Sequence, residues 1–216
     1  MGTRIIGVGK NLPERVVTND EISQYIDTDN EWIIERTGIA QRHVATTEKS
    51  LDMAAAAVLE NTPGERGIIS TYIRNYDDEN EVMKCKANYV NPPFWEDDLT
   101  PRPLSMRGRA VFKFAVNAIE EVTTGALEKI GLTLDDVDWF VPHQANGRII
   151  HAAAQKLGQP LDKFQISIKE SANVSSATVP MALYDLQSSG KLKKGDIIAV
   201  MGFGGGLCAA GAIIEW

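Results

Sequence analysis

Cysteine is almost absent from this sequence: of 216 residues, only Cys85 and Cys208 carry a thiol. They lie far apart, and neither has the nearby Cys or His partner that a zinc site uses. The sequence therefore predicts neither a disulfide-stapled domain nor a metal centre, and we expect a reducing compartment.

Long hydrophobic runs and an excess of positive charge are also missing. No apolar stretch approaches the roughly 18 residues that a membrane span needs, and the N-terminal residues lack the apolar core of a signal peptide. The 22 basic and 29 acidic side chains give a net charge of −7, which disfavours binding to nucleic acid or anionic lipid. We therefore expect a cytoplasmic protein with neither nucleic acid nor membrane as a partner.

The composition is that of a folded globular protein. Apolar residues make up 44% and charged residues 24%, so the chain has enough apolar surface for a core. Its length allows one or two domains.

The first half of the chain predicts short elements and an irregular segment. Residues 18–21 (TNDE) form a capping box that starts one short helix, and a second over 31–36 ends before Gly38. Residues 50–57 (SLDMAAAA) favour a helix, and 67–73 favour a strand. The polar stretch 75–108 is typical of a functional flap or a disordered segment.

The second half is more regular. Its pattern predicts helices at 109–130, 145–157 and 176–189, with strands at 138–141, 164–168 and 197–201 and a final apolar segment at 209–214. Strands that alternate with helices predict an α/β fold with a mostly parallel sheet.

Polar residues follow three of these predicted strands. They are His143, Asn173 and the glycine loop 202–206 (GFGGG). Ligands of parallel sheets bind beyond the carboxyl ends of the strands, so we expect all three on one rim. Imidazole, amide and glycine N–H groups can donate to an enolate or a tetrahedral oxyanion. The alternatives are a structural histidine, an Asx-type turn at Asn173 and a plain glycine turn.

These segments, in this order, resemble β-ketoacyl-acyl-carrier-protein synthase III, a thiolase-like enzyme that starts fatty acid synthesis. Residues 141–146 (VPHQAN) resemble its histidine motif, and 171–180 (SANVSSATVP) its asparagine motif. The glycine loop 202–206 resembles the loop of that family, and residues 31–39 (EWIIERTGI) resemble its coenzyme A-binding segment.

The resemblance implies a thiolase-like fold whose second half is largely complete and whose first half is truncated. Residues 1–55 would be the remnant of the first half, with the coenzyme A segment, and 56–216 the second half. The nucleophilic cysteine motif of the family does not appear in the sequence. Neither Cys85 nor Cys208 has the helix N-terminal setting that activates a thiol, so we do not expect either to replace it.

The resemblance also implies roles for single residues in the reaction centre. His143 and Asn173 would stabilise the enolate that forms when malonyl-acyl carrier protein loses CO2. Gly205 would donate a backbone N–H to the thioester oxyanion, and Phe203 would line the pocket.

Two further sets of residues would bind the substrates. Trp32 would stack on the adenine of coenzyme A, with Arg36 and Thr37 on its polar groups; the alternative for Trp32 is packing on the core. A basic patch would hold the acidic carrier protein, and its candidates are Lys113, Arg148 and Lys156, with Arg102, Arg107 and Arg109. Ordinary solvated helix faces are the alternative for these cations.

The sequence thus predicts a member of this acyltransferase family that condenses acyl-CoA with malonyl-acyl carrier protein, impaired by the loss of the cysteine. It would use acyl-CoA as a substrate and hold no permanent cofactor. The resemblance also implies a homodimer, although part of the family's interface belongs to the missing first half, which leaves the oligomeric state open. The alternative is a non-catalytic module that binds acyl-CoA or the carrier protein, or a degenerate remnant.

Overall fold

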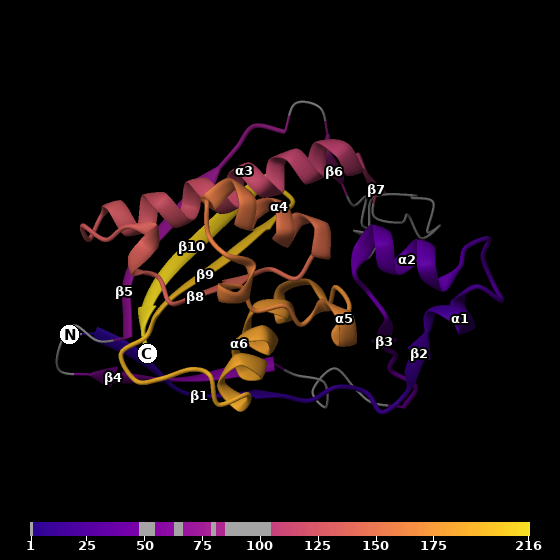
Figure 1. The fold of residues 1–216 in the computed structure, drawn as a ribbon, viewed down its shortest axis with the longest axis horizontal. Coiled ribbons are helices and arrows are strands. Elements are labelled where there is room, and N and C mark those ends of the chain that lie inside the picture. The colour runs from indigo at the N-terminus through magenta and orange to yellow at the C-terminus, as the bar shows by residue number, and fades with distance from the viewer. Residues whose placement is uncertain (1, 48–54, 63–66, 79–80, 85–104) are drawn as a thin grey trace, which may run out of the picture.

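A mixed four-stranded sheet forms the centre of the molecule. The computed structural model describes residues 2–47, 55–62, 67–78, 81–84 and 105–216. The strand order is β5 (Gly67–Asn75), β10 (Cys208–Glu215), β9 (Ile197–Gly204) and β8 (Trp139–Pro142). These strands curve across the middle of the molecule, as Figure 1 shows.

The strand directions correct the expectation of a mostly parallel sheet. β8 pairs parallel with β9, but β10 is antiparallel to both β9 and β5. The reason is the glycine-rich turn after β9, which returns the chain at once as a hairpin instead of through a crossover helix. Three strands therefore share one direction, and the reversed β10 lies between two of them.

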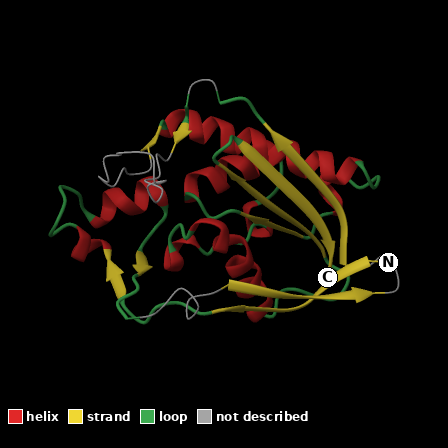
Figure 2. Ribbon diagram, turned by 180° about the vertical axis from the view of Figure 1, so that it is seen from behind, coloured by secondary structure: helices red, strands yellow, loops and turns green. Residues whose placement is uncertain are grey.

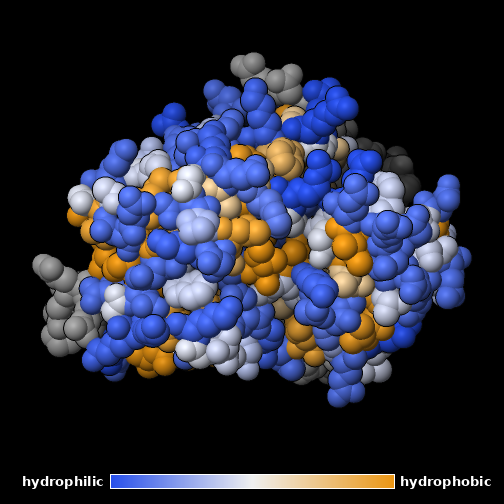
Figure 3. Space-filling view, viewed as in Figure 1, coloured by the Kyte–Doolittle hydropathy of each residue, from blue (hydrophilic) through white to orange (hydrophobic). Residues whose placement is uncertain are grey.

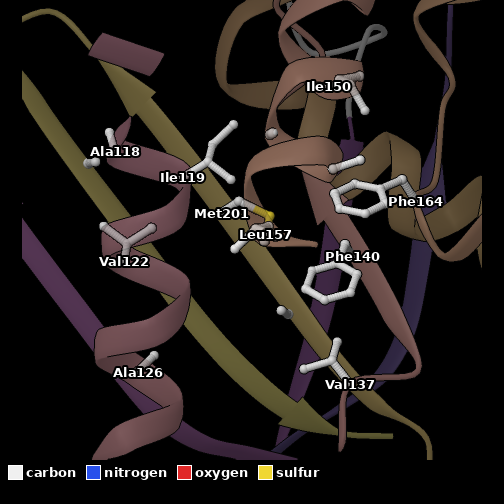
Figure 4. Packing of buried hydrophobic residues seen from close by; sticks show 14 of the residues in the cluster. Ala118, Ile119, Val122, Ala126, Val137, Phe140, Ile150, Leu157, Phe164 and Met201 are labelled. Atoms are coloured by element: carbon white, nitrogen blue, oxygen red, sulfur yellow. The ribbon is translucent and has the colours of Figure 1, made fainter. Parts of the chain in front are cut away.

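Two helices cover one face of this sheet. α3 (Gly108–Glu128) and α4 (Gly147–Leu157) bury apolar side chains against alternate residues of the strands, among them Phe140 and Met201. The rings of Phe140 and Phe164 stack at 4.6 Å in this core. Figure 4 shows how these side chains meet between helix and sheet.

The opposite face carries α6 (Thr178–Ser188) and, beyond it, a separate pair of strands. α6 buries Ala182, Leu183 and Leu186 against Val141 and Ile198. Its other side contacts β1 (Gly2–Lys10) and β4 (Ala55–Thr62), which pair antiparallel with each other. α6 therefore lies between two sheets, and Figure 2 shows the same layers from behind.

α6 covers this face of the central sheet only in part. Ile73 on β5 is 72% exposed, and a hollow of about 220 Å³ lies over Thr71, Val200, Ala210 and Ala212. Hydrophobic residues also reach the surface in the middle of the face drawn in Figure 3. A strip of small and apolar residues thus stays open to solvent beside α6.

The remaining elements lie to one side of the sheets. β2 (Val16–Thr18) pairs with β3 (Gln41–His43), and they flank α1 (Asn19–Ile22) and α2 (Asn30–Thr37). Shorter elements complete the fold: β6 (Met83–Lys84), β7 (Ser105–Met106), α5 (Ile168–Ser171) and 3₁₀ turns at Leu134–Asp136, Leu161–Lys163 and Ser175–Ala177.

Two local predictions are wrong. The alanines from Ala55 onward belong to strand β4 and not to a helix, because pairing with β1 overrides their helix propensity; residues 48–54 lie outside the described residues. The predicted strand at 164–168 is a single parallel bridge between Phe164 and Phe140, followed by α5. Most of the polar stretch 75–108, with Cys85, also lies outside the described residues.

We expect Gly211 to limit how closely α3 approaches the sheet. A Cβ on Gly211 would lie 2.8 Å from the carbonyl oxygen of Val122, which is backbone and cannot swing away. Gly211→Ala should lower the free energy of unfolding by about 1–3 kcal/mol in urea denaturation.

The matched control for this change is Gly9→Ala in β1. Apart from Gly9 itself and its two neighbours in the chain, no residue would come within 4 Å of a Cβ on Gly9, so this variant should stay within about 0.5 kcal/mol of the parent. Equal stability of the two variants would contradict the tight contact between α3 and β10.

Candidate active site

His143 follows β8 directly and is held by backbone and side-chain hydrogen bonds. Its N–H donates to the carbonyl of Met201 on β9 at 2.7 Å, and its Nδ1 contacts the hydroxyl of Thr178. The ring lies edge-on to Phe203 at 5.2 Å. Burial lowers the pKa of His143 below its ordinary value because the charged form loses water. The imidazole is therefore neutral at pH 7.

The neighbouring Gln144 fixes this loop. Its side chain is fully buried, and its Nε2 donates to the carbonyls of Pro142 and Gln165 at 2.8 and 3.1 Å. Its Oε1 accepts from the N–H groups of Ser167 and Ile168 at 2.9 and 3.2 Å. One amide thus satisfies four backbone groups and ties the end of β8 to the start of α5.

A pocket of about 500 Å³ opens beside His143. It lies on the α6 side of the sheet, and its walls come from β5, β9, β10 and the turn before α6. The lining residues that bear on chemistry are His143, Phe203, Gly204, Cys208, Ser175 and Ser176. A largely apolar hollow with a few convergent polar groups is the usual form of a small-molecule site.

The glycine loop lies beside His143, as the sequence predicts, but Gly205 is not among the described residues that line the pocket. Phe203 and Gly204 line the pocket, and the Phe203 ring packs between His143 and Phe114. Gly205 is exposed, and its carbonyl accepts from the Cys208 thiol at 3.4 Å. Its role as an oxyanion donor stays a prediction.

Asn173 is not among the described residues that line this pocket. Its Oδ1 accepts from the N–H of Ser175 at 3.0 Å, which is the Asx-type turn that the sequence left open. Ala172 and Ser175, with φ of 56° and 57°, hold the loop in the left-handed region. Such backbone is costly for residues other than glycine, and it recurs at functional sites. Asn173 is therefore connected to the pocket by its hydrogen bond to Ser175, which lines it.

A second pocket, of about 450 Å³, is basic. Arg36, Arg109 and Arg148 line it, together with Phe112 and Asn146. Nearby, Trp32 is 52% exposed, and the Arg36 guanidinium lies 5.7 Å from its ring centroid. The structure therefore brings Arg36, predicted for coenzyme A, together with Arg148, predicted for the carrier protein.

Close backbone contacts place α2 against the N-terminus of α4 at this basic pocket. A Cβ on Gly147 would lie 3.2 Å from the carbonyl oxygen of Thr37 and 3.4 Å from the Cα of Gly38, so the two segments meet without intervening side chains. Asn146 donates to the carbonyl of Arg36 at 3.0 Å and accepts from the N–H of Arg148 at 2.8 Å. Asn146 thus caps α4 and anchors α2 with one side chain.

The other predicted binding residues differ in whether their polar groups already have partners within the chain. The Thr37 hydroxyl donates to the carbonyl of Ile33 at 2.6 Å and accepts from the N–H of Ile39 at 3.1 Å, so it is engaged locally. Lys113 is exposed on α3. Lys156 pairs with Glu120 of α3 at 2.7 Å, which offsets its charge.

Sequence reasoning missed the parts that Gln144 and Thr178 play. Both residues lie inside the motifs identified in the sequence. A motif does not reveal that their side chains are only zero and one per cent exposed.

Within the described residues there is no group of three or more metal-binding side chains. None of the described helices has the length and apolarity to cross a membrane.

Residues 127–216 match the sequence model of a family described as "3-Oxoacyl-[acyl-carrier-protein (ACP)] synthase III C terminal". A β-ketoacyl-[acyl-carrier-protein] synthase III of Clostridium acetobutylicum is 29% identical over an alignment of 318 positions, covering 98% of each chain. That of Clostridium novyi is 42% identical over 166 residues, which are 76% of this chain and 51% of the relative.

Solved structures show the same fold. The crystal structure of 3-oxoacyl-[acyl-carrier-protein] synthase III from Aquifex aeolicus matches with a TM-score of 0.89 at 24% identity, covering 100% of both chains. The priming β-ketosynthase of the R1128 polyketide pathway matches with a TM-score of 0.83, covering 98% of this chain and 95% of the other.

These findings define the fold as the thiolase-like fold of the condensing enzymes. The chain is a relative of β-ketoacyl-[acyl-carrier-protein] synthase III, which is an acyltransferase. The alignment with the Clostridium acetobutylicum protein spans 318 positions against 216 residues here, so that relative has a long stretch without a counterpart in this chain.

We expect the buried amide of Gln144 to stabilise the site loop strongly. Gln144→Leu keeps the volume but leaves four buried backbone groups without their partner, and should cost about 3 kcal/mol or more. Thermal unfolding followed by circular dichroism should show a Tm lowered by roughly 6–12 °C.

The control is Gln187→Leu on the exposed side of α6, which should leave Tm nearly unchanged. If the two leucine variants melt together, the four hydrogen bonds of Gln144 do not contribute as the geometry indicates.

Proposed function

We propose that this chain is a β-ketoacyl-acyl-carrier-protein synthase III type protein of fatty acid biosynthesis that binds acyl-CoA and malonyl-acyl carrier protein. Its condensation through a cysteine thioester is impaired. The observation that carries the proposal is the pocket lined by Arg36, Arg109 and Arg148 beside the exposed Trp32. Guanidinium groups match phosphate oxygens, and an exposed indole offers a face to an adenine ring.

The pocket beside His143 is proposed to hold the reacting acyl group. Its walls are largely apolar, and His143 and the glycine loop bring polar groups to one end. Asn173 and the N–H of Gly205 are proposed as donors to the enolate and thioester oxygens, with Phe203 as a wall. His143 is proposed to contact the reacting group directly.

Impairment is proposed because the residues absent from this chain include the family nucleophile. Ile6, Val58 and Leu59 on the β1–β4 pair are each more than half exposed, as is Ile73 on the central sheet. Exposed apolar surface of this kind supports the proposal that the chain has lost a segment that covers both sheets in the family. We place the lost segment at the alanine run 54–57, where the two proposed halves 1–55 and 56–216 meet.

Cys208 is the thiol that the described residues offer as a substitute. It lines the pocket with His143, and its thiol donates to the carbonyl of Gly205. It begins a strand and not a helix, so it lacks the helix N-terminal setting of an activated nucleophile. We therefore propose that Cys208 does not carry an acyl group.

The carrier protein is proposed to dock on the same basic side. Lys113 is exposed, and Arg148 lies at the edge of the arginine pocket, which suits an acidic partner. Lys156 contributes less because Glu120 offsets it. A homodimer remains a prediction from the resemblance, and a cytoplasmic location remains a prediction from the sequence composition.

A second candidate function is binding without catalysis. The arginine pocket does not need the lost cysteine to hold a coenzyme A moiety, so the chain would act as an acyl-CoA or carrier-protein binding module. The two candidates differ in whether any covalent intermediate forms.

We expect coenzyme A itself to bind through the arginine pocket. Trp32→Ala and Arg148→Ala should each weaken binding by about 10-fold, because each removes a stacking or charge-assisted contact of about 1.4 kcal/mol. Isothermal titration calorimetry at about 0.1 M salt would measure this. Trp139→Phe, a change of another indole away from this pocket, should leave the affinity unchanged. Equal affinity of all variants would overturn the assignment of the pocket.

We expect no acyl-enzyme from this chain. The intact mass of 23.7 kDa should show no acetyl adduct after incubation with acetyl-CoA. An adduct that disappears in Cys208→Ala or Cys85→Ala would contradict the impairment and establish a relocated nucleophile. Binding of coenzyme A without an adduct would favour the binding module over a degenerate remnant.

A further inference from the structure

The hydroxyl of Thr178, at the first position of α6, touches three groups of the site at once. Its side chain is 1% exposed. Its Oγ1 donates to the carbonyl of Ser175 at 2.9 Å and accepts from the N–H of Gln144 at 3.2 Å. The third contact is to Nδ1 of His143.

The chemistry of these partners decides where each hydrogen lies. A hydroxyl has one hydrogen and two lone pairs. The Ser175 carbonyl can only accept, so it takes the hydrogen of the hydroxyl. The backbone N–H of Gln144 can only donate, and it uses one lone pair. The remaining lone pair faces Nδ1 of His143, which must therefore bring a hydrogen of its own.

We infer that Thr178 is a positioning residue that holds neutral His143 in the Nδ1–H tautomer, with the lone pair of Nε2 left for a molecule in the pocket. The edge contact with Phe203 restrains the ring from another side, and the hydrogen bond to Met201 holds the backbone of His143. Neutral His143 is then a hydrogen-bond acceptor toward the pocket.

The tautomer is inferred from the geometry alone, but its consequence for the reaction rests on the proposed function. The family resemblance gives His143 the task of stabilising an enolate, which requires a hydrogen on Nε2. In the Nδ1–H tautomer that hydrogen arrives only with a second proton on the ring, and burial opposes the charged form. The oxyanion contacts then come from Asn173 and the glycine loop, and His143 accepts a hydrogen bond or a proton from the bound molecule.

The chain contains an internal reference for the experiment. Nδ1 of His43 lies 2.6 Å from the carbonyl of Pro13. A carbonyl cannot donate, so neutral His43 must also carry its hydrogen on Nδ1. His43 thus reports the spectrum of the tautomer that we infer for His143.

Long-range ¹H–¹⁵N correlation spectra of the ¹⁵N-labelled protein test the inference. They are recorded at about pH 8, above the ordinary histidine pKa of about 6.5, and His143→Gln assigns the ring. We expect Nδ1 of His143 to show the protonated and Nε2 the unprotonated shift, as for His43. An Nε2–H pattern in the parent protein would overturn the inference.

Variants separate positioning from simple support of the fold. Thr178→Ser keeps the hydroxyl and should keep the Nδ1–H pattern. Thr178→Val and Thr178→Ala remove it and should shift the population of His143 toward the Nε2–H form, with His43 unchanged. An unchanged His143 pattern in a folded Val or Ala variant would refute the role of Thr178. If neither variant folds, the parent spectrum still decides the tautomer.

The readout is independent of catalysis. A chain that binds no acyl-CoA but shows the Nδ1–H pattern would refute the proposed function and keep the inference. A chain that binds it but shows the Nε2–H pattern would do the reverse.

Discussion

The buried amide of Gln144 is the interaction on which the site depends. It bonds to four backbone groups and thereby ties the end of β8 to the start of α5. The same residue's N–H reaches the Thr178 hydroxyl, which in turn contacts His143. The orientation of the imidazole is thus set by a polar network, and such networks hold a unique geometry only when each member is satisfied.

The basic pocket depends on a different device, which is close backbone packing. Gly38 ends α2 with a positive φ of 77° and lies against Gly147 at the start of α4. Because neither residue has a side chain, the segments that carry Arg36 and Arg148 come into backbone contact although they are far apart in the sequence. The charge of the pocket is therefore local, in a chain whose net charge is −7.

Much of the fold could be predicted from the sequence, because the helices and strands of the second half carry clear apolar periodicity and glycine stops. The strand at the alanine run could not, since it comes from pairing with β1, a contact of long sequence separation. In the candidate site, the motif order predicted the meeting of His143 with the glycine loop. The tautomer of His143 and the four bonds of Gln144 could not be predicted, because both depend on which groups the fold buries together.

The position of β10 has a consequence for how the chain reaches this structure. This strand lies between β5 and β9 and begins only at Cys208, whereas β5 begins at Gly67. During synthesis β5 has no partner in the central sheet until the end of β10 has emerged from the ribosome. Contacts of such high sequence separation form slowly, and an unpaired strand edge associates readily with other chains. The topology therefore leaves the edge of nascent β5 open to pairing with another chain until synthesis has passed residue 215.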